Sequence, residues 1–434
     1  MFQGVNETNT SHVQDERRLA ECVSPRTNFV FIKVHKAGST TTAAVMARFA
    51  LRRNLSVMSP VSGGGVHAAW PNTDLTLDDF YHTPDEVYNV LFHHTVYNKE
   101  WMERKFPSDT AYLAIIRQPF SHLKSTFNFY GIDRSLPFKN KDNPLKEFLK
   151  NPSRYPTSFR LRGVLVDKTR NAQAFDLGYP VEKATDMKGG EEYIEQLDRD
   201  FTLVLILEYF DHSLVMLRRL MCWETKDILY DTTPRRQQKY PYKSYRPTEV
   251  EREAHRQWSP VDYAMYHRFN QTLWQKIAQQ GPDFFQELTY FRQVNQQVNE
   301  FCRQKKPRAA KQIPESTWGS AFNITDQSCS LLRMYFKAID SKIGKQQGRP
   351  VLKVPCERKD VGPTTSIPFF LQGGPMMATF AGGLKMKKRT LRRLTHEQRE
   401  IVGTLRKELR RCQDKQKGMK DVFIEGMGKF KKPR

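Results

Sequence analysis

Short apolar runs alternate with amphipathic stretches over most of the chain. Four of these runs have the length and composition of strands that are buried on both faces. They lie at residues 28–34, 87–92, 111–117 and 201–207. Stretches with helical spacing follow at residues 41–54, 119–130 and 211–221. This alternation predicts an α/β protein with a parallel sheet and helices on both faces.

The character of the chain changes after Phe301. Lys, Arg, Gln and Pro become dense, and a segment rich in Pro and Gly precedes a basic tail with helically spaced apolar residues. Residues 1–27 are polar and contain two Asn-Xaa-Ser/Thr sequons. We therefore expect a polar stem at 1–27, one α/β domain at 28–305 and a C-terminal extension at 306–434, loop-rich at first and then helical.

The net charge of +23 indicates anionic partners. Nucleic acid, acidic membranes, sulfated glycans and phosphorylated cofactors all qualify. More than half of the charge lies in residues 385–434, where a solvated extension is the simplest interpretation. Contact of this tail with a membrane surface or a sulfated glycan is the alternative. Nucleic acid is not expected, because zinc-finger spacing and RNP-like aromatic strands are both missing.

The six cysteines are widely spaced and form neither a CxxC motif nor a paired Cys/His pattern. The sequence therefore predicts no metal site. Together with five sequons, they favour a secretory compartment and a few disulfides, and any of about fifteen pairings is open. The sequence shows neither an apolar stretch of membrane-spanning length nor the apolar core of a signal peptide.

The first predicted strand and helix are joined by the sequence KVHKAGSTT at residues 33–41. The N-terminus of a helix binds anions through unpaired N–H groups and a partial positive charge. Lys36 adds a charge, Gly38 lets the backbone come close, and the hydroxyls that follow add donors. Because the Lys precedes the Gly, this is not a Walker A sequence, and it fits a phosphosulfate better than ATP with magnesium. A plain turn with solvated lysines is the alternative. The residues expected to hold the anion are Lys33, Lys36, Ala37, Gly38, Ser39, Thr40 and Thr41.

A second cluster follows the third predicted strand. Arg117 ends that strand, Pro119 begins the next helix, and Ser125 stands eight residues after Arg117. The forked guanidinium and the hydroxyl are suited to holding one phosphate together. Arg-Xaa-Pro alone is a weak signal, so this prediction depends on its pairing with the loop at 33–41.

Together the two clusters resemble the donor sites of Golgi carbohydrate sulfotransferases, which hold the 5′-phosphosulfate and the 3′-phosphate of 3′-phosphoadenosine 5′-phosphosulfate (PAPS). Further segments are similar to the galactose 3-O-sulfotransferases, the family that includes galactosylceramide sulfotransferase. These segments are residues 171–179, 203–214, 220–224 and 266–274, and the similarity runs in order from about residue 22 to 305.

This resemblance implies a P-loop-like sulfotransferase fold with PAPS as co-substrate and no metal. It implies transfer of a sulfuryl group to the 3-hydroxyl of galactose on a glycolipid or glycoprotein glycan. It also implies a Golgi location and an N-terminal membrane anchor, although this sequence shows no anchor.

Sulfuryl transfer to a sugar hydroxyl requires a base, and a His that titrates near neutrality is suited to this role. His94 follows a predicted strand and matches a His of the family, while His35 lies in the anion loop. The sequence does not decide which of the two is the base. For each, the alternative is a structural role as a hydrogen-bonded His. Lys36 is expected to stabilise negative charge on the leaving phosphate.

Glu208 and Asn171 are expected to bind the acceptor. Glu208 ends an apolar strand at the edge where open α/β sheets bind ligands, and Asn171 lies in a family-like segment. A structural role, such as a helix cap or an ion pair, is the alternative for both.

Two other functions remain open from the sequence. One is a sulfotransferase acting on uronic acid or hexosamine in glycosaminoglycans, against which the segments at 171–179 and 203–214 argue. The other is an inactive glycan-binding protein on the same fold, against which the intact Lys36, Arg117 and Ser125 argue.

Overall fold

The computed structural model describes residues 22, 24–61, 66–83, 86–140, 142–233, 240–304 and 309–349, and the backbone of two strands at 366–371 and 374–379. Most of the predicted stem, residues 63–65 and the basic tail with its expected contacts lie outside the described residues. The chain divides into two compact units, one of residues 1–128 with 136–349 and one of residues 129–135 with 350–434.

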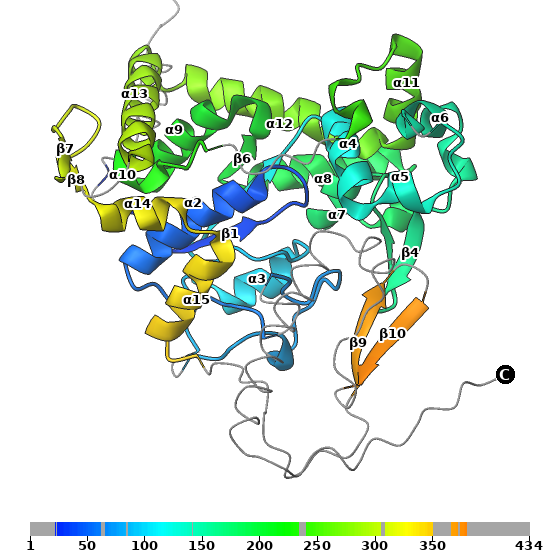
Figure 1. Ribbon diagram of the computed structural model, residues 1–434, viewed down its shortest axis with the longest axis horizontal. Coiled ribbons are helices and arrows are strands. Elements are labelled where there is room, and N and C mark those ends of the chain that lie inside the picture. Colours follow the sequence, from blue (N-terminus) through cyan, green and yellow to red (C-terminus); the bar gives the residue numbers. More distant parts are fainter. Residues whose placement is uncertain are drawn as a thin grey trace, which may run out of the picture. The chain divides into compact units, whose positions relative to one another are not determined.

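A four-stranded parallel sheet forms the centre of the first unit (Figure 1). Its strands are β1 (Phe29–Ile32), β2 (Val90–Leu91), β3 (Ala111–Ile116) and β6 (Leu203–Ile206), in the order β2-β1-β3-β6. Phe29 pairs with Val90 on one side and Ala111 on the other, and Leu113 pairs with Leu203. Each strand lies within a predicted apolar run, so the parallel α/β architecture is confirmed. β1, β2 and β6 are buried throughout, as expected for strands covered by helices.

Helices flank this sheet, and α9 and α12 pack against β6. The helices of the first unit are α2 (Ser39–Arg52), α3 (Lys99–Lys105), α4 (Pro119–Tyr130, of which the last two residues belong to the second unit), α6 (Pro144–Lys150), α7 (Ala172–Asp176), α8 (Met187–Asp200), α9 (Phe210–Met221), α10 (Thr225–Ile228), α11 (Glu249–Trp258), α12 (Pro260–Ala278), α13 (Asp283–Arg303), α14 (Asp326–Arg333) and α15 (Phe336–Gln346). Short 3-10 turns lie at Leu77–Asp79, Pro152–Arg154, Val181–Lys183, Leu207–Tyr209 and Pro241–Ser244. Two small antiparallel hairpins complete the unit, β4 (Ser158–Leu161) with β5 (Val164–Asp167) and β7 (Lys311–Ile313) with β8 (Phe322–Ile324).

An aromatic cluster fixes α2 to the sheet. The indole of Trp223 stacks on Phe49 of α2, with ring centroids 3.8 Å apart, and meets the edge of Phe29 of β1 at 5.5 Å. Its Nε1 donates to the carbonyl of Arg26 at 3.0 Å. Trp223 is only 1% exposed, so it packs the core and does not contact a sugar.

Two disulfides lie within the described residues. Cys22 is bonded to Cys222 across 200 residues of sequence, and Cys302 is bonded to Cys329 across 27. The first joins the start of the described chain to the end of α9. The second joins α13 to α14. The remaining two cysteines lie outside the described residues.

The segment after residue 305 contains ordered structure within the first unit. Helix α15 packs along α2, beside which it lies in Figure 1. The predicted domain limits at 27 and 305 stay predictions. The second unit contains the short helix α5 (Ile132–Ser135) and the antiparallel strands β9 (Ser366–Leu371) and β10 (Gly374–Thr379). Within the described residues, every helix is too short or too polar to cross a lipid bilayer.

Candidate active site

Four polar segments meet at one edge of the parallel sheet, because each follows the carboxyl end of a strand. Lys33 follows β1, the pair His93 and His94 follows β2, Arg117 follows β3, and Glu208 lies just after β6. This is the edge at which open α/β sheets bind ligands.

The loop between β1 and α2 contains two residues in the left-handed backbone region, Lys36 with φ 56° and Gly38 with φ 79°. The left-handed conformation favours glycine at position 38, and a Cβ there would lie 2.5 Å from Leu207 Cδ1, so the leucine side chain would have to shift. The Ser39 hydroxyl donates to the carbonyl of Val34 at 2.6 Å and closes the turn. Within the described residues, no side chain caps the N-terminus of α2. Its first N–H groups are therefore suited to an anionic ligand.

The other residues predicted in this loop differ in their exposure. Lys33 and Ala37 are buried, Thr41 is half-buried and Thr40 is exposed. The Lys33 ammonium lies within the site, 2.7 Å from Nε2 of His94. The hydroxyl of Ser39 is used inside the loop, so its backbone N–H is the group that remains suited to an anion.

Arg117 reaches toward the same loop, and its Nη1 donates to the carbonyl of Lys36 at 3.5 Å. Gln173 of α7 holds the backbone of Arg117 through two hydrogen bonds of 2.8 Å, one accepted and one donated. Burial lowers the pKa of Arg117, while the carboxylate of Glu208 opposes that change. Its Nε has no hydrogen-bond partner among the described residues. A half-buried, incompletely paired guanidinium is suited to an oxyanion. Ser125 lies half-buried on α4, and its shared phosphate contact stays a prediction.

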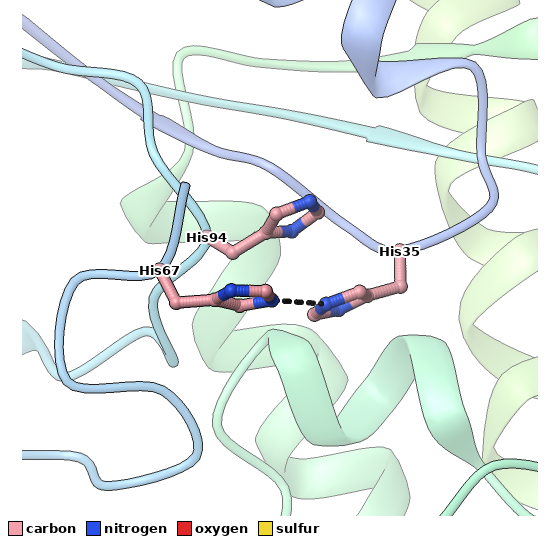
Figure 2. A group of neighbouring side chains, drawn as sticks. All are labelled: His35, His67 and His94. Atoms are coloured by element: carbon pink, nitrogen blue, oxygen red, sulfur yellow. Dashed lines mark hydrogen bonds between the residues drawn. The ribbon is translucent and has the colours of Figure 1, made fainter. Parts of the chain in front are cut away.

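Three imidazoles lie together beside this loop (Figure 2). The rings of His35 and His94 stack with centroids 3.8 Å apart and planes 13° apart. His67 lies beside His35, with its Nε2 3.4 Å from Nε2 of His35, and its ring centroid is 5.1 Å from that of His94. The backbone explains how His67 comes there, because His67 and His94 form a parallel bridge. Both His candidates for the base are thus brought into one cluster.

The carboxylate of Asp176 supports His35 from behind. Its Oδ2 accepts the backbone N–H of His35 at 2.7 Å and Nδ1–H at 2.8 Å. Its Oδ1 accepts the indole N–H of Trp70 at 2.9 Å. The ammonium of Lys168 lies 3.7 Å from the centroid of the Trp70 ring. His122 of α4 contributes a further contact, with its Nε2 2.9 Å from the carbonyl of His35.

Burial and the local charges keep the imidazoles of His35 and His94 neutral. Burial lowers the pKa of His35 well below the usual 6.5, and the charge of Lys168 lowers it further. Burial, with the charges of His35 and Lys33, lowers the pKa of His94 in the same direction. Neutral His35 carries its proton on Nδ1, facing Asp176, which leaves the lone pair on Nε2. That Nε2 has one long contact, 3.4 Å to Nε2 of His67. In contrast, Lys33 donates to Nε2 of His94 and occupies that lone pair.

The three imidazoles also bear on the question of a metal. Their nitrogen atoms lie within 4.8 Å of one another, and such a set can hold a transition-metal ion. However, the charges of Lys33 and Lys168 act directly on His35 and repel a further cation. The rings of His35 and His94 also stack face to face, 13° from parallel, with their centroids 3.8 Å apart. The donor set fits neutral imidazoles beside an anion better than a metal centre, and the metal-free site stays a prediction.

The two predicted acceptor residues make structural contacts. Glu208 is exposed, and its carboxylate accepts the N–H of Gln118 at 3.1 Å and the hydroxyl of Tyr266 at 3.3 Å. Asn171 is buried, with φ 47°, and its Oδ1 accepts the N–H groups of Val261 and Asp262 at the start of α12. These contacts fit the structural alternative for both residues, and their binding of an acceptor stays a prediction.

Sequence reasoning overlooked three side chains of the cluster, namely His67, Trp70 as a partner of Asp176, and Lys168. His67 and Trp70 lie in an irregular segment just after a Gly-rich stretch. There, neither apolar periodicity nor motif spacing marks them. His67 stands two residues after Gly65, and only its bridge to His94 places it in the site.

A parallel sheet with an uncapped helix N-terminus and paired Lys and Arg at its carboxyl edge is the arrangement of α/β proteins that bind phosphorylated ligands. Residues 3–317 match the family model described as Galactose-3-O-sulfotransferase. The chain therefore belongs to the galactose-3-O-sulfotransferase family. Members of this family use PAPS and are Golgi-resident.

Individual relatives agree with this assignment. The chain is 30% identical over 283 residues to galactosylceramide sulfotransferase of Mus musculus, with 64% of each chain covered. It is 31% identical over 292 residues to galactose-3-O-sulfotransferase 3 of Homo sapiens, with 65% of each covered. For galactose-3-O-sulfotransferase 2 of Mus musculus, the identity is 30% over 289 residues, covering 64% of this chain and 71% of the relative. The chain thus spans somewhat less than two thirds of the length of the galactosylceramide sulfotransferases that it matches.

Proposed function

We propose that this protein transfers a sulfuryl group from PAPS to the 3-hydroxyl of galactose on a glycolipid or glycoprotein glycan. The observation that carries the proposal is the meeting of two loops, in which the Arg117 guanidinium lies 3.5 Å from the carbonyl of Lys36. Both loops were predicted from sequence to hold the two ends of one donor. Family membership supports this choice of donor and acceptor.

In this proposal, Lys36 and the N–H groups at the start of α2 hold the phosphosulfate and stabilise the charge that develops on the leaving phosphate. Lys33 assists from the buried side of the loop. Arg117 and Ser125 hold the 3′-phosphate. PAPS supplies an activated sulfuryl group, and the fixed cations take the electrostatic role that magnesium has in kinases.

We propose His35 as the base. The galactose oxygen forms a bond to sulfur while the bond from sulfur to the phosphate oxygen breaks, and the hydroxyl proton passes to Nε2 of His35. Asp176 orients the ring and stabilises the imidazolium that forms, as a carboxylate does in a Ser-His-Asp triad. His94 is the weaker choice for the base, because Lys33 lies 2.7 Å from its Nε2, whereas the contact of His35 Nε2 with Nε2 of His67 is longer, at 3.4 Å.

An acceptor panel tests the function. Purified protein with labelled PAPS should label lactose-like β-galactosides or galactosylceramide, and analysis of the product should place the sulfate on O3 of galactose. The same panel includes glycosaminoglycans with uronic acid and hexosamine acceptors. Labelling of those chains without any β-galactoside would overturn the galactose assignment. Absence of transfer to every acceptor would favour a glycan-binding role.

A further inference from the structure

Helix α15 lies outside the region that matches the family model, yet it packs against elements of the candidate active site. The model match ends at residue 317, and α15 spans Phe336–Gln346. The helix packs along α2, whose N-terminus forms the anion loop (Figure 1). Its first turn also reaches the residues that follow β1 and β2.

The ring of Phe336 forms this contact. It is 3% exposed, and its centroid lies 5.5 Å from the Lys33 ammonium. It packs edge-on against Phe92 and His93, with centroids 5.5 Å and 5.4 Å away. Phe336 therefore lies against Lys33, the donor of the Lys33–His94 hydrogen bond. It also packs against the two residues that precede the acceptor, His94.

Asp340 lies one helical turn after Phe336 and fixes the same region. Its carboxylate accepts the Ser59 hydroxyl at 3.0 Å and a guanidinium N–H of Arg349 at 3.2 Å. Nε2 of the fully buried His93 lies 3.5 Å away. Burial alone would raise the pKa of Asp340, but His93 and Arg349 lower it to about 2. Asp340 is thus a carboxylate at neutral pH, and it lies against the segment that carries His93.

The helix is fastened at both ends. The disulfide between Cys302 and Cys329 ties α14, which precedes α15, to α13. After α15, Gln347 donates to the carbonyl of Leu55 at 3.3 Å and Arg349 donates to the carbonyl of Val57 at 3.4 Å. These bonds hold α15 in register with the segment that follows α2.

We propose that Phe336 is a positioning residue for the transferase site, holding the ammonium of Lys33 against His94 and at the anion loop. A lysine side chain has several rotatable bonds, and ordering it costs side-chain entropy. The Phe336 ring restricts that side chain. The proposal rests on the proposed function in assigning Lys33 to the donor site. It extends that site to a segment beyond the family match.

The test compares Phe336→Ala with Ile343→Ala in the full-length chain. Ile343 lies on the same helix, about 10 Å farther along its axis, and is equally buried at 1%. Phe336→Ala should lower kcat/KM for sulfuryl transfer about 10- to 100-fold more than Ile343→Ala, since a shift of about 1 Å in a positioned group can cost about 100-fold. Phe336→Leu, which keeps an apolar side chain at the position, should recover part of the loss and serves if the Ala variant does not fold.

Two readouts separate positioning from a loss of stability. Displacement of Lys33 removes a charge that lowers the His35 and His94 pKa values, so the acid limb of the pH–rate profile should move to higher pH in the Phe336 variants and stay in place in Ile343→Ala. Binding of 3′-phosphoadenosine 5′-phosphate, measured by calorimetry, should weaken in the Phe336 variants alone. Equal losses in both variants, with an unmoved acid limb, would overturn the proposal. If the wild-type protein binds this nucleotide but sulfates no galactoside, the galactose assignment fails. The nucleotide affinities of the Phe336 variants and of Ile343→Ala can then still be compared, and this comparison tests the role of Phe336.

Discussion

Asp176 holds His35 by two hydrogen bonds to one oxygen atom, 2.7 Å from the backbone N–H and 2.8 Å from ring Nδ1. The backbone bond fixes where the residue lies, and the ring bond fixes how the imidazole is turned. A neutral His35 then presents the lone pair of Nε2 on the side away from Asp176. This relationship distinguishes His35 from His94 as the proposed base.

Replacing Asp176 with Asn should therefore impair the base without removing the donor. The Asn amide can donate to Nδ1 and stabilise the wrong tautomer, with an expected drop in kcat of about 100- to 10,000-fold. Binding of 3′-phosphoadenosine 5′-phosphate should change little. Asp186→Asn, at the exposed start of α8, is the control. An unchanged kcat in Asp176→Asn would argue that His35 is not the base.

Removal of the loop cation should abolish turnover. Lys36→Ala is expected to lower kcat by at least about 100-fold, because the charge on the leaving phosphate loses its nearest fixed cation. Transfer of labelled sulfate to a β-galactoside measures this. Lys150→Ala, at the exposed end of α6, should keep full activity. Wild-type rates in Lys36→Ala would show that another loop holds the phosphosulfate.

Removal of a second cation should shift the pH profile. The charge of Lys168 helps to lower the His35 pKa, so the wild-type acid limb is expected well below pH 6.5. In Lys168→Met, the His35 pKa rises, His35 becomes protonated at a higher pH, and the acid limb moves upward. The pH dependence of kcat/KM measures the shift. Arg170→Met removes a charge that stacks on Trp258 and should leave the limb in place.

Binding of the 3′-phosphate by Arg117 should depend on Gln173. Gln173→Leu removes both hydrogen bonds that hold the Arg117 backbone, and we expect the KM for PAPS to rise about 10-fold. Arg117→Ala should raise it further. Titration with 3′-phosphoadenosine 5′-phosphate gives the affinity directly, and Arg104→Ala on the exposed face of α3 is the control. Equal affinity in all variants would place the 3′-phosphate elsewhere.

The histidine cluster should function without a metal ion. Activity should survive dialysis against a chelator, because Lys33 and Lys168 repel a cation from the cluster. Elemental analysis of the purified protein should find less than one transition-metal ion per chain. Loss of activity on chelation, with recovery on addition of zinc, would assign a metal to His35, His67 and His94.

The sequence located the sheet and the two loops because both are local signals. An apolar run predicts a buried strand, and a Lys-Ala-Gly-Ser turn before a helix predicts an anion site, without knowledge of any distant contact. The predicted strand at 201–207 became β6, and the helix expected to begin at residue 41 begins two residues earlier, at Ser39.

The supports of the site depend on contacts that sequence spacing does not encode. Asp176 is 141 residues from His35, and Gln173 is 56 residues from Arg117. His67 meets His35 only because an irregular segment runs beside the end of β2. The choice between His35 and His94 likewise required the positions of Asp176 and Lys33.

Helix α7 is five residues long, and it carries both Gln173 and Asp176, three positions apart on one face. The same short helix thus supports both Arg117, proposed to bind the 3′-phosphate, and His35, proposed to accept the proton. A shift of α7 would move Arg117 and His35 together, so on this proposal donor affinity and turnover should change together. We therefore expect relatives that prefer other acceptors to differ in the loops that face the sugar. The sequence of α7 should change little among them.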